Sequence, residues 1–171
     1  MRKAVVPFVL SVGLMVVWAA PADAASTRAD YIAQVDPICQ SFVGPMGAAW
    51  GAFDRAFKRT TRAARKGTLK AFLRGTKREA GSLNQLAGTR TSMIDQIAVV
   101  PPAGADVGAI AVWLDHLRQE VAFERSAASA VRKLQIGKYF NRLKQADTAE
   151  NAGHQAIAGF GFQVCGNFPV V

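Results

Sequence analysis

Two histidines and two glutamates are the side chains whose spacing comes nearest to a chemical site. His116 and Glu120 are four residues apart, as are Glu150 and His154, so each pair shares one face of a helix. A helical hairpin that turns near residue 135 would bring both pairs to one height. Imidazole and carboxylate groups together can hold a divalent metal. Because di-metal helix bundles use Glu-x-x-His, and pairs four apart are also ordinary surface partners, we expect no metal here and keep the four as weak candidates.

A concentration of positive charge is the strongest anomaly of composition. Ten Lys and Arg residues and no acidic residue occupy the stretch from Arg55 to Arg78. Cations at a helix C-terminus offset the helix dipole, which explains part of the run. Lys70 instead falls in the first turn of the next predicted helix, where free backbone N–H groups make an anion site. The alternative is a solvated face that serves solubility.

The predicted partners of this charge are anionic envelope polymers, lipid head groups or nucleic acid, bound without sequence preference. The candidate anion-binding residues are Arg62, Arg65, Lys66, Lys70, Arg132, Lys133, Lys138 and Arg142.

Motifs of nucleophilic catalysis are absent from the sequence. It has no Gly-x-Ser-x-Gly elbow and no glycine-rich loop that could cradle a phosphate. We therefore expect a binding protein rather than an enzyme, and no cofactor.

The elements that must position these residues are helices. Apolar residues recur every three or four positions, which predicts an all-α protein. The first helix carries Pro37 and Pro45 and should kink or break, with Asp36 as a possible N-cap. Thr68 is a plausible cap of the second helix, and Gly137 marks a turn before the fourth. The predicted helices cover 27–66, 68–98, 105–134 and about 138–164.

Short connections between these helices predict an up-down-up-down four-helix bundle with a kinked first helix. The turns near Gly67 and Gly137 then share a basic end, and the opposite end is acidic, with Asp30, Asp36, Asp95 and Asp106. A rival function is a small hydrophobic-ligand carrier with a cavity inside the bundle, against Trp50 or Trp113.

Two cysteines, Cys39 and Cys165, allow a single intramolecular disulfide. In the bundle the fourth helix ends where the first begins, so the two should meet, and closing so long a loop would stabilise the fold by roughly 4 to 5 kcal/mol. Two free thiols or an intermolecular bridge are the alternatives.

The first 24 residues are typical of a secretory signal peptide. Arg2 and Lys3 precede an uncharged run, and the small residues Ala22 and Ala24 suit cleavage before Ala25. The alternative is an uncleaved membrane anchor. Cleavage leaves one helical domain, residues 25–171, with 19 basic and 11 acidic residues, no membrane span, and a secreted or envelope-associated location.

The composition of the chain fits one soluble domain. Of its 171 residues 50% are hydrophobic, too many for intrinsic disorder, while the mean hydropathy of +0.12 is too low for a multi-span membrane protein.

Four segments carry a resemblance: ADYIAQVDPIC (29–39), VVPPAGAD (99–106), the Trp113-Leu114 pair and GFQVCG (161–166). The chain resembles small exported helical proteins of actinobacterial type, in which an Ile-Cys near the mature start pairs with a Cys-Gly at the end. The resemblance implies a helical fold and export, and no chemistry.

Overall fold

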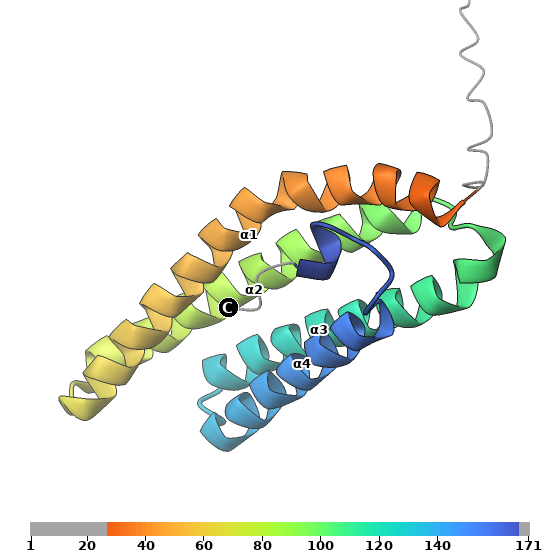
Figure 1. Ribbon diagram of the computed structural model, residues 1–171. Helices are drawn as coiled ribbons and strands as arrows, with labels where there is room; N and C mark the ends of the chain where they lie inside the picture. Colours follow the sequence, from red (N-terminus) through yellow and green to blue (C-terminus); the bar gives the residue numbers. More distant parts are fainter. Residues whose placement is uncertain (1–26, 168–171) are drawn as a thin grey trace, which may run out of the picture.

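The computed structural model describes residues 27–167, and its regular elements are all helical (Figure 1). The four long helices follow one another up and down, which confirms the predicted all-α bundle. The elements are α1 (Arg28–Arg65), α2 (Leu69–Ala98), the short 3-10 helix η1 (Gly104–Asp106), α3 (Val107–Arg132), α4 (Ile136–Ala156) and the 3-10 turn η2 (Cys165–Asn167).

Helix α1 is continuous across both of its prolines. Thr27 and Asp30 form a capping box at its start, because each side chain accepts a hydrogen bond from the other residue's backbone N–H. Pro37 and Pro45 lie on the exposed face, and the helix bends rather than breaks (Figure 1). The predicted kink is thus present as a curvature of one helix.

The helices pack as two antiparallel hairpins. Helix α1 lies along α2 and α3 lies along α4, and α2 packs against α3 to join the pairs. At Gly75 a Cβ would stand 2.6 Å from Thr60 Oγ1 and 3.1 Å from Thr60 Cα, so the absence of a side chain lets α2 approach α1 closely there.

The buried side chains form two clusters along the bundle. One lies beside the disulfide and is rich in aromatic residues, including Tyr31, Trp113 and Phe162. The other lies between the hairpins and includes Phe53, Leu83 and residues of α3 and α4.

The chain end crosses from α4 back to α1, where Cys165 forms the predicted disulfide with Cys39 at a Cα–Cα distance of 5.4 Å (Figure 1). Asp36 holds this segment, because its carboxylate accepts hydrogen bonds from the backbone N–H groups of residues 163, 164 and 165 at 2.8 to 3.1 Å. The prediction that Asp36 caps a helix in α1 was wrong.

The predicted end of the fourth helix was also wrong. Helix α4 stops at Ala156, not near residue 164, because Gly159 and Gly161 adopt φ values of 75° and 106° that a right-handed helix excludes. The apolar residues beyond it, Phe160 and Phe162, pack into the core from a loop.

The two hairpin turns differ in the residue that adopts the left-handed conformation. Gly67 ends the first turn with φ 63°, the usual left-handed position of glycine after a helix. In the second turn Leu134 occupies the equivalent position with φ 59°. Gly137, predicted to mark this turn, is instead the second residue of α4.

No helix within residues 27–167 is long and apolar enough to span a bilayer. The predicted signal peptide, residues 1–24, lies outside the described residues, so cleavage and export stay predictions.

Candidate functional site

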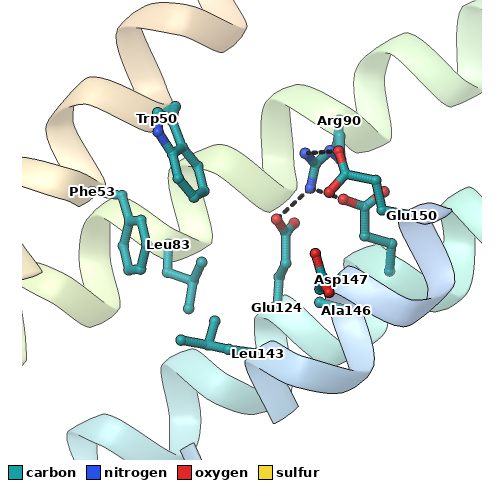
Figure 2. A pocket seen from close by; sticks show the side chains of 10 residues that line it. Trp50, Phe53, Leu83, Arg90, Glu124, Leu143, Ala146, Asp147 and Glu150 are labelled. Carbon is teal, nitrogen blue, oxygen red and sulfur yellow. Dashed lines mark hydrogen bonds and ion pairs between the residues drawn. The ribbon is translucent and has the colours of Figure 1, made fainter. Parts of the chain in front are cut away.

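A buried cluster of charges lies where the hairpins meet, and its centre is Arg90 of α2 (Figure 2). Its guanidinium pairs with Glu120 and with Glu124, the latter at 2.5 Å, and lies 3.6 Å from Glu150 of α4. The Arg90 side chain is only 12% exposed, which is unusual for an arginine. The structure explains it, since three carboxylates surround this one cation.

The imbalance of three carboxylates against one guanidinium is reflected in their proton affinities. Burial raises the pKa of Glu120 to about 9, with Glu150 and Glu124 adding to the effect and Arg90 opposing it. Burial likewise raises the pKa of Glu124 to about 7. One guanidinium does not neutralise three buried carboxylates, so the folded protein retains protons here that an unfolded chain would release.

The four weak metal candidates do not come together as one set of ligands. The hairpin register brings Glu120 and Glu150 together as predicted, but the cation between them is Arg90. His116 lies against Gly153 of α4, and His154 borders a small hollow near the disulfide. The part of the chain that the structure describes contains no group of three or more metal-ligating side chains that could hold an ion.

The hollow beside this cluster is small and polar on one side. Trp50, Phe53 and Leu143 face Glu124 and Asp147 across a volume of about 140 Å³ (Figure 2). A cavity against Trp50 is therefore present, but its charged wall does not suit the apolar ligand of the predicted carrier.

The predicted anion-binding residues gather around the two hairpin turns. The α1–α2 and α3–α4 turns point the same way (Figure 1), and side chains from both ends line one groove. Seven of the eight candidates are exposed, and none of the eight forms an ion pair within residues 27–167. The one candidate that is not fully exposed is Arg142, whose guanidinium donates a hydrogen bond to Gln145 and lies over the ring of Phe123.

At the opposite end three of the four predicted acidic residues have structural partners, while Asp95 is exposed. Asp106 accepts a two-pronged hydrogen bond from Arg28, and Asp36 holds the C-terminal segment. The two ends therefore differ in available charge: most carboxylates at one end are engaged, while most of the cations at the other face solvent.

The basic end also carries exposed apolar side chains. Five of the eight large hydrophobic residues exposed within the described chain lie there, and Leu69 is 68% exposed. Leu69 and Leu73 fit the apolar spacing of α2 but are exposed, because both lie near the end of α2 that projects toward the α1–α2 turn. The five are Leu69, Leu73, Leu134, Ile136 and Phe140.

Leu134 is exposed at a backbone cost. The left-handed conformation costs an L-residue other than glycine roughly 1 to 2 kcal/mol, and glycine fills the matching position of the other turn. Leu134 is 44% exposed and belongs to neither buried cluster of the described residues.

Between the two basic turns runs an apolar groove with a volume of about 330 Å³. All four long helices contribute to it, and Phe57, Phe72, Val131 and Phe140 supply much of its wall. A second hollow shares Ala64 and Phe72 with the groove and reaches exposed Leu69 at the turn.

Two buried polar side chains, Glu79 and Tyr139, line this groove and were missed at the sequence level. They are 1% and 2% exposed. The Tyr139 hydroxyl and the Glu79 carboxylate interact with each other, and neither the hydroxyl nor Glu79 Oε2 has another partner within residues 27–167. Burial, and after it the nearby Glu79, raise the pKa of Tyr139, so its hydroxyl keeps its proton. A glutamate that follows Lys77 and Arg78 looks like part of a solvated face, which is why no pattern revealed it.

Comparison with known proteins leaves the site to be interpreted from its own geometry. No family model, no curated protein and no solved structure matches this chain.

Proposed function

We propose that this protein is an exported, non-enzymatic binding protein that attaches to anionic lipid surfaces through its two hairpin turns. The observation that carries the proposal is that each turn presents an exposed leucine beside unpaired lysines: Leu69 between Lys66 and Lys70, and Leu134 next to Lys133. Lysines attract lipid phosphates, and the leucines can enter the acyl region that lies just beneath them.

Lipid suits this end better than the other anionic partners considered. Nucleic acid and acidic envelope polymers would use the lysines but leave the leucines in water. The backbone cost at Leu134 also supports the proposal, because glycine would relieve it and the leucine lies outside both buried clusters. Each cation near an anionic surface contributes about 1 kcal/mol, which makes several together sufficient for reversible attachment.

Vesicle sedimentation tests the charge component. The full mature chain should bind vesicles that contain phosphatidylglycerol, bind phosphatidylcholine vesicles weakly, and lose affinity as salt rises. Lys70→Glu should weaken binding about tenfold. The matched control is Arg118→Glu, which reverses an exposed charge on α3 away from the turns and should have little effect.

The apolar component has a sharper test in Leu134→Gly. This change should raise the free energy of unfolding by about 1 kcal/mol, because it relieves the left-handed backbone, and yet weaken vesicle binding about tenfold. Val99→Ser and Val107→Ser remove exposed apolar side chains from the other end and serve as controls. The proposal is wrong if the protein binds duplex DNA as tightly as vesicles, or if vesicle binding is indifferent to Leu134→Gly.

A further inference from the structure

We propose that the hollow between Trp50 and Glu124 binds a small organic cation, a primary ammonium group carried on a short hydrocarbon stem. All four long helices line this hollow, and none of the candidate anion-binding residues does. The inference therefore goes beyond the proposed lipid contact and does not depend on it.

The wall of the hollow carries more acidic than basic groups. Its one guanidinium is that of Arg90, and four carboxyl groups line it with Arg90, those of Glu120, Glu124, Asp147 and Glu150. Burial raises the pKa of Glu120 to about 9, so this group keeps its proton near neutral pH. Three carboxyl groups then remain against one guanidinium, and a second cation would reduce the imbalance.

One carboxylate oxygen in this wall has no donor. Glu124 is 3% exposed, and its carboxylate projects from α3 into the space between Trp50 and Arg90 (Figure 2). Oε1 accepts a hydrogen bond from Arg90 at 2.5 Å, whereas Oε2 is buried without a partner within residues 27–167. An unsatisfied buried acceptor is costly, and most of all when it is charged. A ligand with N–H groups would supply the missing donor, which favours a primary over a quaternary ammonium.

The opposite wall suits the stem of such a cation. Trp50 and Phe53 of α1 have ring centroids 5.4 Å apart and planes tilted by 55°, so together they form an aromatic corner. Aromatic rings attract cations through their negatively polarised faces. Leu83 and Leu143 complete the apolar side, against which hydrocarbon can pack.

The size and opening of the hollow limit the ligand. Its volume of about 140 Å³ is close to the roughly 150 Å³ of an engineered cavity that holds benzene, so a ligand of about that size fits. Asp147 is exposed, and the hollow can therefore be entered beside it. A metal ion is a poorer occupant, because the described residues contain no group of three or more side chains that could hold one.

The experiment titrates the isotopically labelled mature chain with butylammonium chloride and follows the indole N–H resonance of Trp50 by NMR. The solution is kept near pH 8, above the pKa of about 7 that burial gives Glu124. We expect a saturable shift from binding of one molecule. Butanol, which lacks the charge, and butyltrimethylammonium, which lacks the N–H donors, should each bind about tenfold more weakly or not at all.

Two variants locate the site. Glu124→Gln keeps the size of the side chain and removes its charge, and it should weaken butylammonium binding about tenfold. Phe53→Leu keeps an apolar wall and removes one ring, and it should weaken binding about threefold. The matched control is Asp115→Asn, which removes a carboxylate from an exposed position of α3 outside the hollow and should change nothing.

The remaining outcomes overturn the assignment. Absence of a saturable shift in the wild-type protein does so directly. Equal binding of either analogue does so too, because the charge or the N–H donors would then play no part. A shift that Glu124→Gln leaves unchanged means that the cation binds elsewhere. Glu124→Gln should still sediment with phosphatidylglycerol vesicles, so each proposal can fail without the other.

Discussion

Glu120 offers the most direct test of the buried charge cluster. If it is neutral in the folded protein, replacing it by glutamine should raise the free energy of unfolding at pH 7, and if it is ionised the same change should lower it. Its carboxyl group is 2% exposed and contacts Arg90, which also pairs with Glu124. Glu120→Gln keeps the size of the side chain and an oxygen that can accept from Arg90, and removes only the ability to ionise.

The expected effect depends on pH. The ordinary pKa of Glu120 is 4.5 and burial raises it to about 9 in the folded protein. Between those values the unfolded chain has released a proton that the folded chain still binds, so wild-type stability falls as pH rises, by up to about 1.4 kcal/mol per pH unit. Glutamine contributes no such loss. The variant should match the wild type near pH 4.5 and exceed it by up to about 3 kcal/mol at pH 7.

Urea unfolding at several pH values, with the disulfide intact, measures this difference. Asp115→Asn is the matched control, since it removes the same charge from an exposed position of α3 and should leave the pH slope of stability unchanged. The reasoning is refuted if Glu120→Gln is less stable than the wild type at pH 7 by several kcal/mol. Breaking a fully ionised buried pair would cost about 3 to 5 kcal/mol, and Glu120 would then be charged in the folded state.

Three other substitutions test how the fold is held. Replacing Cys39 and Cys165 by Ser should lower the free energy of unfolding by up to about 5 kcal/mol, the loop-closure value for a separation of 126 residues, measured by urea unfolding. Asp36→Ala should cost about 1 to 3 kcal/mol and speed amide hydrogen exchange in residues 163–165, whose backbone donors lose their acceptor. Gly75→Ala should lower the melting temperature, since its Cβ would stand 2.6 Å from a side-chain oxygen of α1, whereas Gly81→Ala, in open space, should raise it.

Local pattern was enough to predict much of the fold. Apolar spacing and the Pro101-Pro102 break placed the long helices to within a few residues, apart from the end of α4. Two cysteines and an even number of helices were enough to predict the disulfide. The end of α4 was missed because Phe160 continues the apolar spacing, although Gly159 and Gly161 beside it adopt backbone angles that no right-handed helix contains.

The candidate sites were predictable only in part. Periodicity identifies the apolar face of a helix but not whether another element covers that face, so it could not show that Leu69 and Leu73 are exposed. Burial of Glu79 and Glu124 was missed for the converse reason, since a charged residue in a helix is ordinarily solvated. The one local signal is Arg90, a charged residue among the regularly spaced apolar residues of α2.

The link between Cys39 and Cys165 closes most of the chain into a covalent ring. Both hairpin turns, the proline loop and all of α2, α3 and α4 lie within that ring. A protease that cuts any one peptide bond in it therefore opens the ring but releases nothing, and the two pieces stay tethered until the sulfurs are reduced. The molecule thus tolerates a single nick at its exposed lysine-rich turns without losing a fragment.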